Sequence, residues 1–356
     1  MGERALFDVV VPTVGRPSLR RLIGALAGAA GPPPGRVLLV DARRQPRGPL
    51  LPAGVPERLA GRVVVIGGRA AGPAAARNLG WRQATATWVA FLDDDVLPDA
   101  DWLARLAADL RDLGAEVAGS QGRLRVPLPD DRPSTDWERN VAGLEGARWA
   151  TADMAYRRAA LAEAGGFDER FRRAYREDTD LALRVLRAGH RIERGRRTVA
   201  HPVSPAGALI SVRLQAGNGD DVLMRALHGR GWKRAAGETG GGRRPRHLAT
   251  TACGLLGLAA LAAGRRRLAA IGGLGWLAGG AELAWARIAP GPRTRREVAT
   301  MLLTSPLIPA AATWHWLRGY ARRALERLRA AGVPTAVVSN QSGLACGLLV
   351  HEQVTR

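Results

Sequence analysis

The first hundred residues alternate between short β-rich runs and longer stretches rich in alanine and leucine. This pattern predicts strands at residues 6–12, 36–41, 61–68 and 88–95, and helices at residues 16–28, 74–84 and 101–113. We expect two further strands at 114–126 and 197–203, and two helices within 149–200 that are separated by Gly165–Gly166. Alternation of this kind favours an α/β fold: a Rossmann-like, mostly parallel sheet with helices on both faces.

Acidic side chains follow two of the predicted strands. Asp41 ends the run VLLVD, and Asp93, Asp94 and Asp95 end the run WVAFLDDD. Adjacent carboxylates repel each other unless a cation or solvent relieves the charge. Because ligands bind at the carboxyl ends of strands in such sheets, we expect these aspartates to meet at one edge. An acidic run on a solvated surface is the simpler alternative.

A second acidic pair, Glu177–Asp178, opens the last predicted helix of this region. Acidic side chains at a helix start also serve as caps and as partners of the helix dipole, so both interpretations stay open.

The formal net charge is +21, and it is concentrated toward the C-terminus. Residues 241–356 carry 16 basic and four acidic side chains. Zinc-finger spacings and aromatic-rich basic repeats are absent from the sequence, so we expect no nucleic-acid partner. Basic residues mixed with apolar runs favour an anionic membrane surface as the partner.

Two features bear on the compartment. Cys253 and Cys346 are the only cysteines, which argues against a disulfide framework and fits a reducing cytoplasm. The apolar run before Pro12 is too short for a signal peptide. We therefore expect the N-terminal domain on the cytoplasmic side of the cell membrane.

The composition changes after a Gly- and Arg-rich stretch. Residues 238–247 have the composition of a linker, and apolar segments follow at 248–263, 268–286 and 298–317. Their lengths are marginal against the ~20 residues that span a bilayer, and Glu282 interrupts the second. A soluble helical bundle and a membrane-associated region, peripheral or integral, both fit this pattern.

Three stretches carry a family resemblance: DVVVPTVGRPSLRRLIGAL, GPAAARNLGWRQATATWVAFLDDDVLPDADWLARL and GGFDERFRRAYREDTDLALRVLRAG. In this order they resemble the family-2 glycosyltransferases of the GT-A fold, and the resemblance covers roughly residues 5–235. It implies an inverting, metal-dependent transfer of sugar from a nucleotide-diphosphate donor to a glycan or lipid-linked acceptor in cell-envelope synthesis.

The resemblance also implies roles for individual residues on the donor side. Asp93 and Asp95 would be a DxD pair for Mn²⁺ or Mg²⁺, with Asp93 also facing the ribose and Asp94 between them near the nucleotide. The remaining expected donor contacts are Asp41 at the nucleobase, Pro12 and Thr13 beneath it, and Arg77 and Asn78 near the diphosphate. For Arg77 the alternative is a solvated helix arginine. His201 is a further expected metal ligand, although a lone histidine before a proline is also common as a structural residue.

On the acceptor side, the resemblance implies that Asp178 is the catalytic base and that Glu177 orients it or the acceptor. Asp153, in TADMAYRR, would line the acceptor pocket. A base of this kind contributes roughly 10²–10⁴-fold to the rate.

The C-terminal residues 325–354 resemble part of a haloacid dehalogenase-type phosphatase of the histidinol-phosphate and heptose-bisphosphate kind. SNQSG would be its second motif, with Ser339 binding phosphate. No DxDGT nucleophile motif precedes it, so we expect no phosphatase activity and set aside a bifunctional transferase–phosphatase.

The expected organisation has four parts: a GT-A domain at 1–237, a linker at 238–247, an apolar helical region at 248–320 and the phosphatase-like fragment at 321–356. A non-catalytic sugar-nucleotide or glycan-binding protein with the same fold is the main alternative. A nucleotidyltransferase fits poorly, because VVVPTVGRPS is not the Gly-rich basic loop that it would need.

Overall fold

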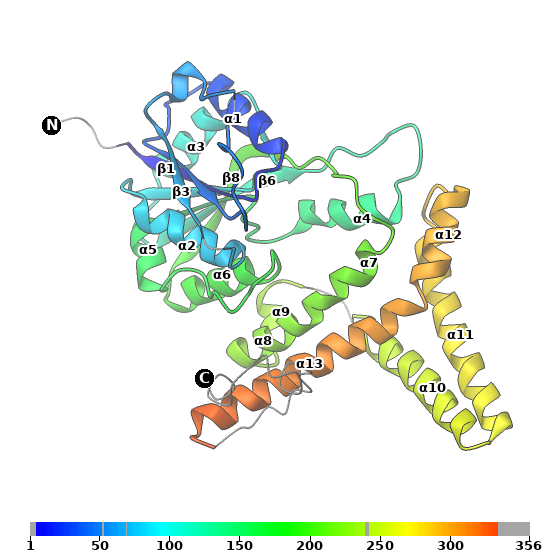
Figure 1. Cartoon of the computed structure of the whole chain (residues 1–356). Coiled ribbons are helices and arrows are strands. Elements are labelled where there is room, and N and C mark those ends of the chain that lie inside the picture. The colour runs from blue at the N-terminus through cyan, green and yellow to red at the C-terminus, as the bar shows by residue number, and fades with distance from the viewer. Residues whose placement is uncertain (1–4, 52, 69, 239–241, 334–356) are drawn as a thin grey trace, which may run out of the picture.

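We describe residues 5–51, 53–68, 70–238 and 242–333 in a computed structural model. They form an α/β domain, from which a long arm of helices extends (Figure 1). The strands are β1 (Phe7–Thr13), β2 (Val37–Asp41), β3 (Val63–Gly67), β4 (Trp88–Leu92), β5 (Leu97–Pro98), β6 (Val117–Arg125), β7 (Asp153–Arg157) and β8 (Arg191–Ala200). The helices of the domain are α1 (Ser18–Gly28), α2 (Pro73–Gln83), α3 (Trp102–Arg111), α4 (Asp136–Ala142), α5 (Arg158–Glu163), α6 (Glu177–Arg187), α7 (Ile210–Arg213), α8 (Asn218–His228) and α9 (Trp232–Ala235).

The strands make one mixed sheet in the order β3-β2-β1-β4-β7-β6-β8-β5. The first four are parallel, as the strand–helix alternation predicts. The other half is mixed and departs in part from the predicted mostly parallel sheet: β7 lies antiparallel between β4 and β6, and β5 is antiparallel to β8, whereas β6 and β8 are parallel. The chain moves outward from β1 to β3 and then returns to β4 on the other side of β1. The carboxyl ends of β1 and β4 therefore form a topological switch point, where α/β sheets bind ligands.

The two faces of the sheet are covered by different helices. Val9, Val11 and Leu39 pack on one face in a core that includes side chains of α1 and α3. Val10, Leu38 and Val40 point to the other face and pack with α2, α5 and α6. This alternation along β1 and β2 is the period of two that a strand imposes on its side chains, and it leaves the carboxyl edge of the sheet free for polar residues.

The helical arm consists of α10 (Arg244–Ala262), α11 (Arg266–Ile288), α12 (Arg295–Thr304) and α13 (Leu307–Ala330). α10 and α11 form a hairpin, and α13 packs along both α10 and α8 (Figure 1). The third expected apolar segment is therefore two helices, broken at Ser305–Pro306. Across the described parts of the chain, we find no helix with the length and hydropathy needed to cross a bilayer.

The helices of the arm cross the predicted boundaries at both ends, because α10 begins at Arg244, within the predicted linker 238–247. α13 continues through residue 320, where the sequence predicted a boundary. Most of the phosphatase-like fragment, including Ser339, lies outside the described residues.

A buried arginine joins the arm to the α/β domain. The Arg287 guanidinium donates to Asp136 Oδ2 and Ser211 Oγ, both at 2.7 Å, in the domain. It also donates to Thr304 Oγ1 at 2.8 Å and Ser305 Oγ at 3.0 Å in the arm. Because a buried charge needs partners for its hydrogen bonds, this network fixes where α11 and α12 meet the domain.

Candidate active site

A cavity of about 1130 Å³ lies at the switch point. Its walls include seven of the residues predicted from the sequence: Pro12, Thr13, Arg77, Asp93, Asp94, Asp95 and His201. The cavity also takes Arg43 and Arg44 from the loop after β2, and Arg172 and Arg173 from the loop before α6. Residues more than 180 positions apart in the chain thus meet at one edge of the sheet.

The central aspartate of the triplet is held by the end of β1. Thr13 Oγ1 donates to Asp94 Oδ2 at 2.6 Å, and Arg16 Nη1 donates to Asp94 Oδ1 at 2.8 Å. Only 3% of Asp94 is exposed. Both of its carboxylate oxygens are engaged, so Asp94 acts here mainly to fix the turn that presents its two neighbours.

Asp95 faces a cation and an imidazole. Arg16 Nη1 lies 2.9 Å from Asp95 Oδ2, and His201 Nε2 lies 3.6 Å from Asp95 Oδ1. Burial and the nearby charge of Asp93 raise the pKa of Asp95. Crowded carboxylates of this kind favour a bound cation.

The donor chemistry at Asp95 and His201 fits a divalent metal. Carboxylate oxygens are the ligands that Mg²⁺ and Mn²⁺ prefer, and imidazole is an accepted companion. His201 Nδ1 is buried and has no hydrogen-bond partner in the described part of the chain. However, no group of three or more His, Cys, Asp or Glu side chains in the described residues is already arranged to hold a metal ion. At Asp95 the compensating charge comes from Arg16.

Arg77 connects the aspartate triplet to the start of α6. Its guanidinium donates from Nη2 to Asp93 Oδ1 at 2.8 Å and from Nη1 to Glu177 Oε1 at 2.7 Å. Only 2% of Arg77 is exposed, although it lines the cavity. Arg77 is therefore a buried bridge between two acidic groups, which excludes the alternative of a solvated helix arginine.

Asp41, the predicted nucleobase contact, is occupied by its own loop. Arg43 Nε and Nη2 donate to its two carboxylate oxygens at 2.9 Å and 2.7 Å. This pairing holds the pKa of Asp41 below its usual value. Ala42 and Arg43 line the cavity, whereas Asp41 is not among its lining residues.

The predicted base lies at the first turn of α6, and the turn before it is strained. Arg176 has a left-handed φ of 78° and directly precedes Glu177. Its side chain is held over the rings of Tyr175 and Trp232 and donates to Asp221 at 2.9 Å. Strained backbone of this kind persists only where the surroundings over-determine it, and it is concentrated at functional sites.

Glu177 and Asp178 have different surroundings. Glu177 is 2% exposed, and burial raises its pKa to about 7 even though Arg77 opposes the shift. Asp178 is half-buried, and its Oδ1 accepts from Thr179 N at 2.6 Å. Burial also raises the pKa of Asp178. Neither carboxylate is among the residues that line the cavity, but Arg172, Arg173 and Ala174, just before them, are.

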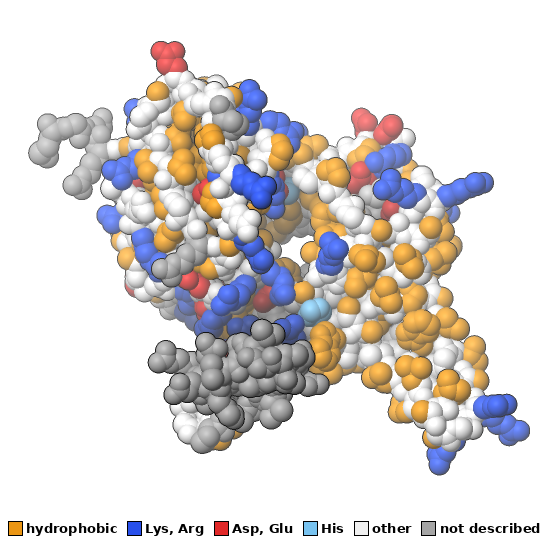
Figure 2. All heavy atoms as spheres, in the orientation of Figure 1, with side chains coloured by type: hydrophobic (Ala, Val, Ile, Leu, Met, Phe, Trp, Pro, Cys, Tyr) orange, Lys and Arg blue, Asp and Glu red, His pale blue; other side chains and the backbone are white. Residues whose placement is uncertain are grey.

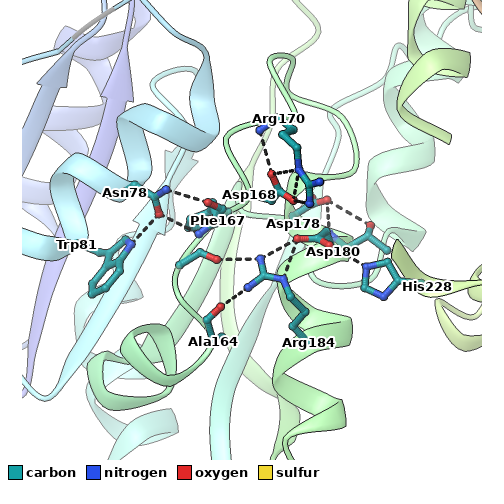
Figure 3. A network of polar contacts seen from close by, with 12 residues as sticks. Asn78, Trp81, Ala164, Phe167, Asp168, Arg170, Asp178, Asp180, Arg184 and His228 are labelled. Carbon is teal, nitrogen blue, oxygen red and sulfur yellow. Dashed lines mark hydrogen bonds and ion pairs between the residues drawn. The ribbon is translucent and has the colours of Figure 1, made fainter. Parts of the chain in front are cut away.

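A polar network fixes α6 from the other side (Figure 3). Arg184 donates to Asp180 Oδ2 at 2.7 Å and to Gly166 O at 2.8 Å, and His228 Nε2 lies 2.7 Å from Asp180 Oδ1. Asp168 and Arg170 pair within the same loop. The helix that carries Glu177 and Asp178 is therefore tied to α8 and to the turn around Gly166.

Asn78 and Asp153, two of the predicted ligand contacts, hold the fold together. Asn78 is 1% exposed, accepts from Trp81 Nε1 at 2.9 Å and exchanges bonds with the backbone of Phe167 (Figure 3). Asn78 therefore holds the loop at Phe167 and does not line the cavity.

Asp153 is fully buried in β7, with Trp102 Nε1 at 2.9 Å and Arg197 Nε at 2.7 Å from its carboxylate. The prediction that Asp153 contacts the acceptor is therefore wrong. Asp153 lies in a central strand, and both of its carboxylate oxygens already accept hydrogen bonds, so neither oxygen is left to bind an acceptor.

The arginines of the cavity were not predicted from the sequence, apart from Arg77. Arg16 and Arg43 each lie a few residues beyond the end of a strand, in TVGRPS and DARRQ. The sequence feature that could have identified them is a basic residue just after a strand, near the predicted acidic edge of the sheet. In a chain with so many arginines that signal is weak, and the tertiary contacts are what single these residues out.

Comparisons with known proteins agree with this geometry. Residues 8–175 match the family model for glycosyl transferase family 2. The pre-mycofactocin glycosyltransferases of two strains of Mycobacterium tuberculosis are 34% identical to this chain over 134 residues, which cover 34% of this chain and 28% of each relative. The chain thus matches less than a third of the length of these curated relatives.

A solved structure of a mannosyltransferase is similar over most of the chain. The mannosyltransferase PcManGT from Pyrobaculum calidifontis, in complex with GDP-Man and Mn²⁺, has a TM-score of 0.51 and 22% sequence identity. The match covers 89% of this chain and 88% of that one. At this identity the likeness concerns the fold. Residues 8–175 are thus similar to glycosyl transferase family 2, and the fold of the chain is similar to that of a solved glycosyltransferase.

Proposed function

We propose that this protein is an inverting, metal-dependent glycosyltransferase. It would move a sugar from a nucleotide-diphosphate donor to a hydroxyl of a glycan or lipid-linked acceptor, in the synthesis of cell-envelope glycans. The observation that carries the proposal is the cavity at the switch point, where three consecutive aspartates meet arginines from four segments of the chain. A diphosphate needs such cations, and an acidic group beside them can hold a divalent metal.

On the donor side, Asp93, Asp95 and His201 would hold Mn²⁺ or Mg²⁺. When bound, the metal would act as a Lewis acid that stabilises the charge developing on the leaving diphosphate. Arg16, which pairs with Asp94 and Asp95, is exposed enough to turn toward a phosphate once that charge is compensated. Pro12 and Thr13 at the end of β1, with Ala42 and Arg43, form the wall against which the nucleoside would lie.

On the acceptor side, Asp178 is our proposed base. Its raised pKa makes its carboxylate a stronger base than an ordinary aspartate. Glu177, fixed by Arg77, would keep the first turn of α6 in place. The acceptor oxygen would lose its proton to Asp178 as it attacks the anomeric carbon from the face opposite the leaving group, which inverts the configuration.

A non-catalytic sugar-nucleotide-binding protein is the alternative. The paired acidic groups at the start of α6 argue against it, since a binding protein has no use for a base with a raised pKa. The two functions separate in one assay with the full chain. Release of nucleoside diphosphate from a panel of sugar donors, measured with and without Mn²⁺, is expected for the enzyme and absent for the binding protein.

We also propose that the arm rests on the cytoplasmic face of the cell membrane. Leucines and Ile271 on α10 and α11 are exposed, several of them by more than half, and three arginines (Arg265–Arg267) stand at the tip of the hairpin. Figure 2 displays this apolar surface with basic side chains at its end. Exposed apolar patches rimmed by polar groups mark interaction sites, and basic clusters select anionic lipid.

Vesicle sedimentation tests the membrane proposal. The protein is expected to bind phosphatidylcholine vesicles that contain phosphatidylglycerol, and to bind less when Arg265, Arg266 and Arg267 are all changed to Gln. Changing Arg20, Arg21 and Arg187 to Gln removes the same charge from exposed positions of the α/β domain. Equal binding by the two triple variants would contradict a specific role for the hairpin tip.

A further inference from the structure

A second cavity, of about 1050 Å³, adjoins the first on the side of the helical arm. The two cavities share six lining residues: Arg16, Asp95, Leu144, Arg173, Ala174 and His201. A ligand in the second cavity would therefore reach Asp95 from a cavity that the loop of Arg43 does not line. Its volume is at the upper end for small-molecule pockets, so it accommodates more than a single small group.

The walls of this cavity come from both parts of the molecule. Trp137 of α4 and Asp221 of α8 stand on the domain side, and Arg244 of α10 and Trp316 of α13 stand on the arm side. The contact of α13 with α8 and the Arg287 network hold these walls together. The arm thus completes a cavity beside the active site, in addition to carrying an exposed apolar surface.

The lining is strongly basic. Six cationic side chains face two acidic ones: Arg16, Arg173, Arg213, Lys233, Arg243 and Arg244 against Asp95 and Asp221. Some of these are already paired, such as Lys233 with Asp221 and Arg243 with Glu282. In the described part of the chain neither Arg213 nor Arg244 has a carboxylate partner, and Arg244 lies over the Trp316 ring at 4.9 Å.

Polar atoms without partners stand beside these cations. The Nε1 atom of Trp316 is buried and, among the described residues, has no hydrogen-bond partner, and the same holds for His201 Nδ1. Buried polar atoms are rarely left unpaired, because each costs roughly 1–3 kcal/mol. An oxygen-bearing ligand in this cavity would satisfy the indole N–H. Apolar side chains, among them Leu214 and Leu248, line the rest.

We propose that this second cavity is the acceptor site, and that it takes an acceptor in which a phosphate group is joined to a bulky, partly apolar body. The inference rests on the proposed function. Arg213 and Arg244 would bind the phosphate, while Trp137, Leu214 and Trp316 would contact the body. The acceptor hydroxyl would then lie where the two cavities meet, near Arg173 and Ala174 in the segment that leads to the proposed base Asp178.

Two sources of such a ligand have the same chemistry: a phosphorylated lipid and a phosphorylated sugar. Dodecyl phosphate, below its critical micelle concentration, and glucose 1-phosphate are suitable probes, with inorganic phosphate as reference. Calorimetric titration into the full chain is expected to give saturable binding of at least one organic probe. It should be about tenfold tighter than inorganic phosphate, which corresponds to about 1.4 kcal/mol. Preference for one probe then identifies the source.

Matched variants locate the binding. Leu214→Glu places a negative charge, which would repel a phosphate, in the cavity wall at a side chain that is 46% exposed. Leu209→Glu is the matched control, because Leu209 is 44% exposed and lines neither cavity. Probe binding is expected to weaken at least tenfold in Leu214→Glu and in the double variant Arg213→Gln/Arg244→Gln, and to persist in Leu209→Glu. Leu256→Glu, on the exposed surface of α10, controls for adsorption of dodecyl phosphate to the arm.

The result that would overturn the inference is equal binding of the probes to wild type and Leu214→Glu, or no preference over inorganic phosphate. Nucleoside diphosphate titrations with Mn²⁺ on the same proteins keep the two proposals separate. Normal nucleotide binding without probe binding refutes the acceptor site alone. If the wild-type protein binds no nucleoside diphosphate, the proposed function itself is refuted.

Discussion

Arg77 Nη1 lies 2.7 Å from Glu177 Oε1, across 100 residues of sequence, and both side chains are at most 3% exposed. The same guanidinium reaches Asp93 at 2.8 Å. A single buried cation therefore joins the first aspartate of the triplet to the turn that carries the proposed base. The donor and acceptor sides of the site are connected by this one residue.

The first prediction concerns the stability of this bridge. Arg77→Met leaves two carboxylates without their cation, and we expect the free energy of unfolding to fall by about 3–5 kcal/mol. Arg82→Met, on the same helix but 52% exposed and 3.8 Å from Glu169, is expected to cost less than about 1 kcal/mol. Chemical denaturation measures both. The double variant Arg77→Met/Glu177→Met should recover part of the lost stability. If it recovered none, the Arg77–Glu177 ion pair would not be the cause of the loss.

The second prediction tests the base. Asp178→Asn is expected to lower kcat by roughly 10²–10⁴-fold, because the amide cannot accept the proton of the acceptor hydroxyl. Binding of nucleoside diphosphate should stay unchanged in the same variant. Asp131→Asn, at an exposed position away from both cavities, serves as the control. Full turnover by Asp178→Asn would remove this residue from the mechanism.

The third prediction concerns pH. Burial raises the pKa of Glu177 to about 7 and also raises that of Asp178. Both groups act as carboxylates in our account, so activity should be lost as pH falls through these raised values. The acid limb of kcat/KM is then expected near pH 7 and not near the value of ~4 for an unperturbed carboxyl group. Glu177→Gln removes one of the two titrations and should change the limb. A profile that is flat from about pH 5 to about pH 8 would contradict this assignment.

The fourth prediction concerns Asp153, which the structure places in the core. Asp153→Asn leaves Arg197 buried with a weaker partner, and we expect stability to fall by up to about 3–5 kcal/mol. KM for donor and acceptor should not change. Asp99→Asn, with its carboxylate 40% exposed and 3.4 Å from Arg125, is the control of the same chemistry. If Asp153→Asn changed the acceptor KM and left stability normal, Asp153 would be an acceptor-site residue and this prediction would be contradicted.

Sequence patterns predicted the part of the site that depends on local order. The parallel strands β2 and β4 end close to where their apolar runs end, so Asp41 and Asp93–Asp95 could be assigned to one edge before any contact was known. The position of β7 could not be predicted, because DMAYR is five residues long and sits directly before a helical run. The family resemblance implies that Asp153 lines the acceptor pocket, whereas Asp153 lies buried within a central strand.

The ion pairs also escaped prediction. Two ion pairs, Asp41–Arg43 and Asp95–Arg16, form because loops fold back over the strand ends. Neither pair has a sequence spacing that is a recognised motif. The break at Ser305–Pro306 shows a related limit. The apolar run 298–317 continues through it, but the chain turns there so that α13 can return along α10 to the domain.

The central claim is that the aspartate triplet and its arginines bind a nucleoside diphosphate together with a metal ion. Calorimetric titration of UDP, GDP, TDP and CDP into the full chain, with and without Mn²⁺, tests it most directly. We predict saturable binding of one of these nucleotides that depends on Mn²⁺ and is lost in Asp95→Asn. If folded protein bound none of them, or bound them equally well without metal and with Asp95→Asn, the proposed donor site would be contradicted.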